Sequence, residues 1–216
     1  LNKTTANKLY VKNIDFHTGA TGSIRISNFN AICFFDSCNF LYARSGNCME
    51  NPTFRSLFFY KCKAKYAFLD CFSYRGSGVA FEIDCIGSEG GYSLDSISDN
   101  GTTSHGNAYT LRINGKYNFN GDRNVHDIDV TRNWLVACEA GSVKNASTDP
   151  YSSANFLSGY PSTVSGDVTR TRLTLCKSNG GAVCDVGAVG YGTVELDRCV
   201  GMTNQYTSEN GTTIDI

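Results

Sequence analysis

The sequence is poor in proline and histidine, and it lacks both charge runs and long apolar runs. Its 216 residues include 3 Pro and 3 His, and the net charge is -1 with 19 Lys and Arg. Basic residues never follow one another in a run of four, so the charge pattern of a nucleic-acid-binding surface is missing. No apolar stretch approaches the roughly 18 residues that a membrane-spanning helix needs. We therefore expect neither a nucleic-acid partner nor insertion into a membrane.

Helical periodicity is also missing, whereas residues typical of β-strands are plentiful. The chain contains 22 Gly, 12 Tyr and 13 Phe, and its apolar residues alternate in short bursts such as "SLFFYKC", "VAFEIDC" and "TRLTLC". Alternation with a period of two is typical of strands with one buried face. We predict an all-β protein with a single domain over residues 1–216. Because the chain begins at Leu1 within sequence that already has this pattern, we expect it to be a piece of a longer chain.

The cysteines recur at a nearly constant spacing, which indicates an internal repeat. Cys38 and Cys62 are 24 residues apart, Cys62 and Cys85 are 23 apart, and Cys176 and Cys199 are again 23 apart. The 91 residues between Cys85 and Cys176 are close to four such periods. Apolar residues alternate ahead of each of these cysteines. The sequence therefore predicts that the same structural unit repeats along most of the chain.

A strand, a turn, a second strand and a loop in each period are typical of a coiled parallel sheet, whose turns stack about 4.8 Å apart. About nine turns of 22–23 residues fit into the chain. Two polar stretches, about 95–108 and 140–168, are predicted to be long loop insertions. Such loops either build a binding groove on a rigid scaffold or are tolerated insertions and subunit contacts.

In such a coil the five cysteines lie one above another, at the same corner of successive turns. Free cysteine is a small and readily buried side chain, so we predict reduced, buried thiols in place of disulfides. Reduced thiols indicate folding in a reducing compartment. A zinc site needs closely spaced cysteines or nearby histidines, and no cysteine pair of the sequence has a histidine close to it. We expect no metal site and no cofactor.

Short runs of alternating apolar residues that end in a cysteine are repeated over most of the chain. Crossover connections between parallel strands are right-handed as a rule. With this pattern the sequence resembles the right-handed parallel β-helix of the pectin-lyase-like superfamily, most of all its bacteriophage tailspikes and depolymerases. The resemblance implies a homotrimer in the phage tail of a virion. It implies binding of a polysaccharide at the bacterial cell surface, either capsule or lipopolysaccharide O-antigen, and its cleavage by a glycoside hydrolase. The alternatives are a polysaccharide lyase, a non-catalytic adhesin or fibre trunk, and a secreted or cell-surface bacterial protein.

Hydrolysis of a glycosidic bond usually requires two carboxyl groups that lie about 5–9.5 Å apart. If Phe59, Ile83 and Val130 point into the coil, their neighbours in the sequence point out of it. Four carboxylates then form an outward group, which we predict to be catalytic: Glu82, Asp84, Asp127 and Asp129. Residues two apart on one strand lie about 6.5–7 Å apart, which suits this chemistry. The alternative is a surface ladder of ion pairs with no catalytic role.

The candidates for binding the polysaccharide are a cation, a histidine and three aromatic residues: Arg112, His126, Trp134, Tyr60 and Phe58. Trp134 is the only tryptophan of the chain, and it either stacks against a sugar ring or fills the core. Phe58 and Tyr60 belong to an outward apolar patch of a size that a soluble monomer does not leave exposed. This patch is covered either by a sugar chain or by the sister chains of a trimer.

Overall fold

The protein is a parallel β-solenoid in a computed structural model that describes most of the strands. The described residues are 8–17, 24–25, 29–51, 54–75, 78–91, 101–105, 109–121, 124–128, 130–141, 158–159, 169–178, 185–186, 192–200 and 213–215. Within these ranges every regular element is a β-strand, and no helix is long and apolar enough to cross a membrane. The predicted all-β fold class is confirmed.

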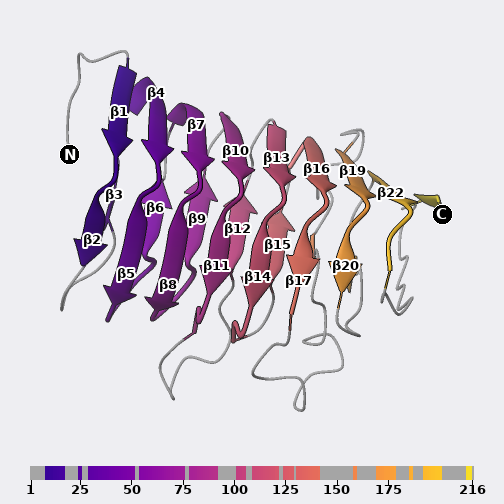
Figure 1. The fold of residues 1–216 in the computed structure, drawn as a ribbon. Coiled ribbons are helices and arrows are strands. Elements are labelled where there is room, and N and C mark those ends of the chain that lie inside the picture. Colours follow the sequence, from indigo (N-terminus) through magenta and orange to yellow (C-terminus); the bar gives the residue numbers. More distant parts are fainter. Residues whose placement is uncertain are drawn as a thin grey trace.

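Three parallel sheets run along the coil (Figure 1). Sheet A consists, in order, of β1 (Lys8–Lys12), β4 (Phe29–Asp36), β7 (Phe54–Tyr60), β10 (Val79–Ile83), β13 (Tyr109–Ile113), β16 (Arg132–Val136), β19 (Thr169–Thr174), β22 (Gly192–Asp197) and β23 (Thr213–Asp215). Sheet B consists of β2 (Asp15–His17), β5 (Asn39–Ala43), β8 (Lys63–Ala67), β11 (Ile86–Ser88), β14 (Lys116–Asn118), β17 (Glu139–Ala140) and β20 (Lys177–Ser178). Sheet C consists of β3 (Ile24–Arg25), β6 (Met49–Asn51), β9 (Phe72–Arg75), β12 (Thr102–His105), β15 (Val125–Ile128), β18 (Ser158–Gly159) and β21 (Asp185–Val186).

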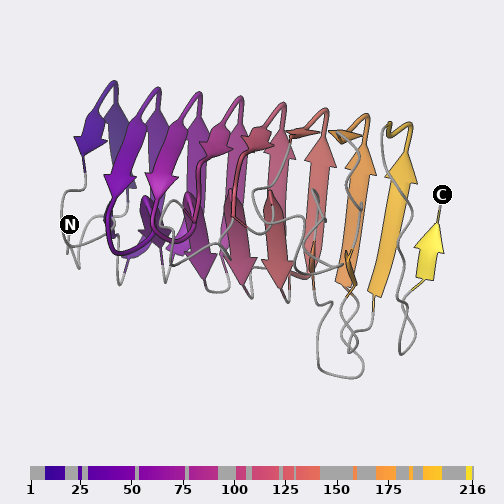
Figure 2. The same cartoon turned by 90° about the horizontal axis from the view of Figure 1, so that it is seen from below.

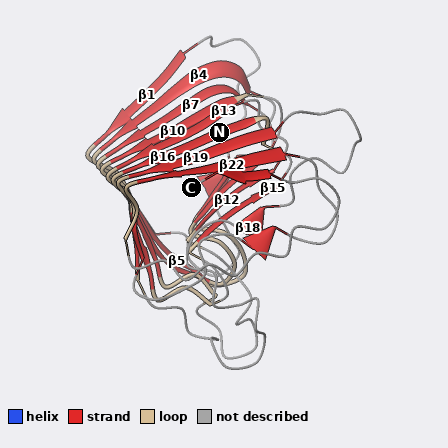
Figure 3. Cartoon of the chain, turned by 90° about the vertical axis from the view of Figure 1, so that its right-hand side faces the viewer, coloured by secondary structure: helices blue, strands red, loops and turns tan. Residues whose placement is uncertain are grey.

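From β1 to β21 the chain visits the three sheets in the same order, so that neighbouring strands of one sheet come from successive turns. The four turns from β4 to β15 each contain three strands of at least three residues. Figure 2 shows the strands stacked in sequence order from indigo to yellow, and Figure 3 shows the three sheets as the walls of one coil. Each strand therefore presents alternate side chains to the interior and to the outside of the coil.

The corner between sheets A and B has the same geometry in successive turns. Its first residue has a positive φ of 51–55° at eight positions along the described chain: Asn13, Ser37, Lys61, Asp84, Asn114, Ala137, Leu175 and Arg198. The next residue is a cysteine in six of them: Cys38, Cys62, Cys85, Cys138, Cys176 and Cys199. The predicted stack of cysteines is present, and Cys138 is a member that the spacing did not predict. The described cysteines are free, and all but Cys199 are buried.

The corner thiols donate to main-chain carbonyls of the preceding turn. Cys62 Sγ lies 3.5 Å from the carbonyl oxygen of Phe35, and Cys176 Sγ lies 3.5 Å from that of Leu135. Burial is the main cause that raises the pKa of Cys62 to about 12. The thiol therefore stays protonated at neutral pH and remains able to donate. Cysteine suits this corner because it is small and still offers a weak donor.

The predicted four periods between Cys85 and Cys176 are wrong. Only two corners lie between them, and they contain Gly115 and Cys138, so the three intervals are 30, 23 and 38 residues. The turns are longer here, and solenoid strands lie within both predicted insertions: β12 within 95–108 and β18 within 140–168. Much of both stretches lies outside the described residues. Because the extra residues add nearly one further period, the spacing alone miscounted the turns.

The described core forms two hydrophobic clusters along the coil. The first extends from Val11 to Cys85 and contains the stacked rings of Phe35 and Phe59, whose centroids are 5.1 Å apart. The second extends from Tyr117 to Cys176. Stacking of like side chains from successive turns buries a continuous apolar column, as expected for a solenoid.

Candidate functional site

At the corner between sheets A and B, the residue after the one with positive φ is usually a cysteine. The residue three positions before it, in sheet A, faces the interior of the coil. Register pairs these positions along sheet A as Phe35, Phe59, Glu82, Arg112, Leu135, Leu173 and Leu196. The prediction that Ile83 faces inward and Glu82 outward is therefore wrong. Ile83 pairs with Tyr60, and Glu82 pairs with the buried Phe59. The backbone conformation of the corner determines the register, so the inward position is taken by a glutamate even though an isoleucine is adjacent.

Glu82 is fully buried and forms an ion pair inside the coil. Its Oε1 accepts from Arg112 Nε at 3.0 Å and from Thr102 Oγ1 at 2.7 Å, and its Oε2 accepts from Tyr117 Oη at 2.8 Å. The side chains of Glu82 and Arg112 have no exposed area. A carboxylate with donors on both oxygens is satisfied without water. In this position Glu82 cannot contact a polysaccharide.

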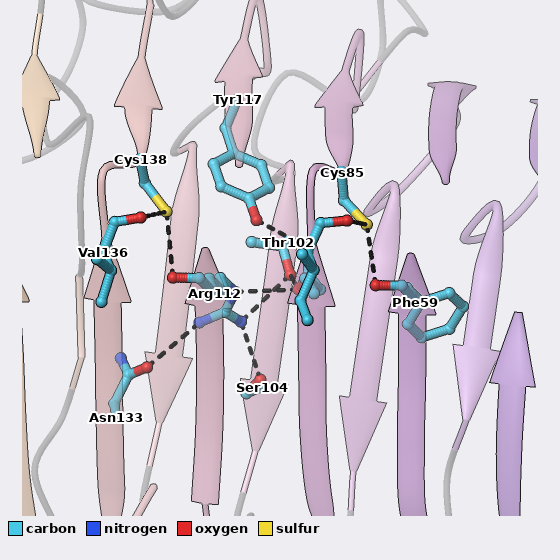
Figure 4. Close-up of polar contacts among 11 residues, drawn as sticks. Phe59, Cys85, Thr102, Ser104, Arg112, Tyr117, Asn133, Val136 and Cys138 are labelled. Atoms are coloured by element: carbon cyan, nitrogen blue, oxygen red, sulfur yellow. Dashed lines mark hydrogen bonds and ion pairs between the residues drawn. The ribbon is translucent and has the colours of Figure 1, made fainter. Parts of the chain in front are cut away.

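Arg112 is likewise buried, contrary to the prediction that it faces a ligand. It donates through Nη2 to Thr102 Oγ1 at 3.2 Å and to Ser104 Oγ at 3.1 Å, and through Nη1 to Asn133 Oδ1 at 3.4 Å (Figure 4). Burial, followed by the charge of Glu82, holds the pKa of Tyr117 well above its ordinary value, so its phenol stays protonated as a donor. Glu82, Arg112 and their hydrogen-bond partners form a polar layer between the two hydrophobic clusters of the core.

The remaining predicted carboxylates do not form one column with Glu82. Asp84 is the corner residue with a φ of 55°, and its Oδ1 accepts from Asn114 Nδ2 at 2.7 Å. Asp127 lies in β15, a strand of sheet C, in register with Ser104, while Glu82 lies in sheet A. The prediction that Glu82 and Asp127 belong to one outward group is therefore wrong. The side chains of His126 and Asp127, and the whole of Asp129, lie outside the described residues.

The outer face of sheet A carries a column of aromatic and charged side chains at the position just before each inward residue. Register pairs them in the order Tyr10, Phe34, Phe58, Phe81, Leu111, Trp134, Arg172 and Glu195. The rings of Phe58 and Phe81 stack with centroids 4.7 Å apart. Of the predicted binding residues, Phe58 and Trp134 share this column. Tyr60 lies in the adjacent outward column, in register with Asp36 and Ile83.

A groove with a volume of about 550 Å³ lies on this face, over β10 to β22. We call it the sheet A groove, and its lining residues are Val79, Phe81, Tyr109, Thr110, Leu111, Arg132, Asn133, Trp134, Arg172 and Glu195. Tyr109 is 47% exposed and Trp134 is 45% exposed. The groove thus combines an apolar floor with two exposed aromatic rings and three charged side chains.

Trp134 is held in place from two sides. Its Nε1 donates to Thr174 Oγ1 at 3.3 Å, and the guanidinium of Arg172 lies 5.7 Å from its ring centroid. The alternative that Trp134 fills the core is wrong, since the next residue, Leu135, takes the inward position. An ordered indole that is half exposed offers a ready surface for stacking, because little side-chain entropy is lost on binding.

Arg172 is engaged by carboxylates at the far end of the groove. Its Nε lies 4.0 Å from Glu195 Oε2, and its Nη2 lies 3.6 Å from Asp197 Oδ2. The hydrogen bond from Arg198 is the main cause that lowers the pKa of Asp197, and Arg172 contributes further. Asp197 is therefore ionised at neutral pH. Arg172 links the indole of Trp134 to these two acidic residues.

Sequence reasoning missed Tyr109, Arg132, Arg172 and Glu195 as lining residues of this groove. Arg172 and Glu195 stand four residues before Cys176 and Cys199, which is the same offset that Phe58 has from Cys62. Counting back four residues from each corner cysteine would therefore have identified Arg172 and Glu195. The corner of the β13 turn contains Gly115 in place of cysteine, so it carried no signal for Tyr109 or Leu111.

The chain matches no protein-family model, no curated protein and no solved structure. The chemistry of the candidate site is therefore inferred from its own residues. Exposed aromatic rings beside fixed charges can stack against sugar rings and hydrogen-bond their hydroxyl groups. Among the residues that the structure describes, no group of three or more His, Cys, Asp or Glu is arranged to hold a metal ion.

Proposed function

We propose that this protein binds a polysaccharide of the bacterial surface, capsule or lipopolysaccharide O-antigen, in the sheet A groove. The observation that carries the proposal is the pair of half-exposed rings, Tyr109 and Trp134, that line the groove on adjacent strands. Adjacent strands lie about 4.8 Å apart, which is close to the length of one sugar ring along a glycan chain. Rings on a rigid sheet can therefore meet successive sugars of an extended polymer.

The proposal includes the architecture and setting that the sequence resembles. We propose a right-handed parallel β-helix of about nine turns, similar to the pectin-lyase-like superfamily, in the tailspike of a bacteriophage. The protein then acts at the bacterial cell surface as part of a homotrimeric virion component. The aromatic column at the other end of sheet A supports a trimer, because Tyr10 and Phe34 stack there at 5.5 Å on an outer face. Sister chains would cover these rings.

We extend the proposal to cleavage of the bound polymer by two carboxyl groups. Glu195 lines the groove and is our candidate for one of the pair. Asp197 stands two residues further along β22, about 6.5–7 Å away, and is the candidate for the other, because Asp127 lies on sheet C three turns earlier. One group protonates the leaving oxygen while the other activates water or attacks the sugar. Glu82 is removed from this list because it is sealed inside the coil.

Binding is tested by titrating the protein with purified surface polysaccharides and following tryptophan fluorescence, to which Trp134 is the only contributor. A bound polymer is expected to change this emission. Calorimetry then compares the protein with Trp134→Ala. We expect this variant to bind about tenfold more weakly, by analogy with the loss of about 1–3 kcal/mol when an aromatic ring that stacks on a nucleobase is removed. Tyr42→Ala is the matched control, because Tyr42 is 48% exposed but lies in sheet B. Unchanged affinity of Trp134→Ala would place the binding site elsewhere.

Cleavage is tested separately by measuring new reducing ends and unsaturated sugars after incubation with the same polysaccharides. Release that is abolished by Glu195→Gln supports the hydrolase. Binding without any release favours the second candidate, a non-catalytic adhesin or fibre trunk. Unsaturated products favour a polysaccharide lyase.

A further inference from the structure

The two ends of the sheet A groove differ in charge and in polarity. Val79, Phe81 and Leu111 form an apolar floor over β10 and β13. Arg132 lies beside this floor on β16, in register with Tyr109. Glu195 lies at the opposite end, on β22. A ligand that fills the groove therefore meets apolar side chains, then a cation, and finally an acidic residue.

Arg132 and Arg172 are both held against aromatic rings, but they differ in their partners. The guanidinium of Arg132 lies 5.8 Å from the ring centroid of Tyr109, and that of Arg172 lies 5.7 Å from Trp134. Arg172 also pairs with Glu195 and Asp197. Within the described part of the chain, no carboxylate lies within ion-pair distance of Arg132. Arg132 is thus the cation of the groove that is available to an anionic ligand group.

The environment of Arg132 suits a carboxylate better than a neutral hydroxyl group. A guanidinium presents a planar fork that binds a carboxylate through two parallel hydrogen bonds. Its contact with the Tyr109 ring restricts the side chain, so that less entropy is lost on binding. The neighbouring floor is apolar and would remain in contact with water unless the ligand carries an apolar substituent beside the anion.

From this arrangement we infer that the sheet A groove selects a glycan whose repeating unit carries a carboxylate next to an apolar substituent, such as an acetyl group or the methyl group of a deoxy sugar. The carboxylate binds Arg132, the apolar substituent packs on Val79, Phe81 and Leu111, and a sugar ring stacks on Trp134. Glu195 repels the anion at the other end and so sets the direction of the chain in the groove. This inference rests on the proposed function and specifies its ligand.

Four defined hexasaccharides test separately whether the ligand needs a carboxylate and whether it needs an apolar substituent. Hyaluronan carries a carboxylate and an acetyl group. Fully N-acetylated chitohexaose carries only acetyl groups, hexagalacturonate carries only carboxylates, and maltohexaose carries neither. We expect hyaluronan hexasaccharide to bind most tightly, at least about tenfold more tightly than maltohexaose, with the other two between them. The advantage of the carboxylated ligands should shrink at high salt, since the guanidinium is exposed. The emission of Trp134 reports binding of each ligand.

The variant Arg132→Gln tests the position of the anion. It should weaken both carboxylated ligands about tenfold and leave chitohexaose unchanged, while Arg132→Lys, which keeps the charge without the fork, should fall between. Arg44→Gln is the matched control, because Arg44 is exposed and lies outside the groove. Equal loss for neutral and carboxylated ligands would overturn the assignment of Arg132. Equal binding of hyaluronan and chitohexaose would overturn the requirement for a carboxylate.

The outcomes distinguish this inference from the proposed function. If surface polysaccharides bind and depend on Trp134, but neither the defined ligands nor Arg132→Gln show a preference for carboxylates, the inference fails and the proposed function stands. If no defined ligand binds, the inference also fails. If, in addition, no surface polysaccharide changes the emission of Trp134, the proposed function fails with it.

Discussion

The interior of the solenoid is built differently in its first turns and in its middle. Between β4 and β9 the inward side chains are apolar and include a cluster of aromatic rings, in which Phe59 contacts Phe35, Phe40 and Phe72 with centroid distances of 5.1–6.0 Å. Between β10 and β13 the same column contains Glu82 and Arg112. Each aromatic contact contributes in proportion to the apolar area it buries, and the loss of one leaves the others in place. Each charge, by contrast, is tolerable only while its partner is present.

This difference indicates where the coil is most sensitive. A buried pair contributes little net stability, because the cost of removing two charges from water offsets their attraction. Its loss is nevertheless expensive, since one charge then remains buried alone. In a solenoid, where each turn contacts only its neighbours, such damage should separate the core before Cys85 from the core after Tyr117.

The largest expected effect is that of Glu82→Leu, which leaves Arg112 buried without a countercharge. We expect a loss of about 3–5 kcal/mol in the free energy of unfolding, measured by denaturant titration. The double variant Glu82→Leu/Arg112→Leu should recover part of this loss, although Thr102 and Tyr117 lose their acceptor. A loss below about 1 kcal/mol for Glu82→Leu would mean that water reaches the pair.

A smaller effect is expected in the aromatic part of the core. Phe59→Leu keeps an apolar side chain of somewhat smaller volume, so we expect a loss of about 1–2 kcal/mol by the same titration. The remaining rings, Phe35 and Phe72, can adjust around leucine. A loss as large as that of Glu82→Leu would remove the proposed contrast between the two interiors.

The cysteine corner should make the protein sensitive to alkaline pH. The pKa of Cys62 is raised to about 12 by burial, so its folded value lies above that of an unfolded thiol. The stabilising contribution is fully present below about pH 8.5 and is lost as the pH rises toward 12. Thermal unfolding as a function of pH should show this loss, and Cys62→Ala should reduce its slope. An unchanged slope in the variant would assign the alkaline transition to other groups.

The smallest effect is expected at a surface ion pair between β14 and β17. Lys116 Nζ lies 3.9 Å from Glu139 Oε2, and both side chains are more than half exposed. Glu139→Leu should change the free energy of unfolding by at most about 0.5–1 kcal/mol, since water screens the pair. It is the matched control for Glu82→Leu, because both variants remove a glutamate that pairs with a cation. A similar loss in both would show that burial does not set the cost.

Much of the fold could be predicted because a cysteine stands at the same position of most repeats. The cysteines at 38, 62 and 85 marked the corner correctly, and alternation before them identified the strands of sheet A. The count of turns failed where Gly115 replaces cysteine and where the turns are longer. The candidate site was found only in part: Trp134 was named, and Phe58 lies in the same outer column but outside the groove. Arg132 gave no signal as a single exposed arginine in the sequence.

The sequence by itself determined the parallel solenoid, because a period of about 23 residues with alternating apolar positions allows few other ways to bury the same side chains. The tertiary structure alone decided which polar residues lie inside. Polarity placed Glu82 and Arg112 on the outside, but the positive-φ corner sets the register, and the register brings the two charges together from adjacent turns. Since they neutralise each other only when they are neighbours in space, no property of either residue alone could reveal a buried pair.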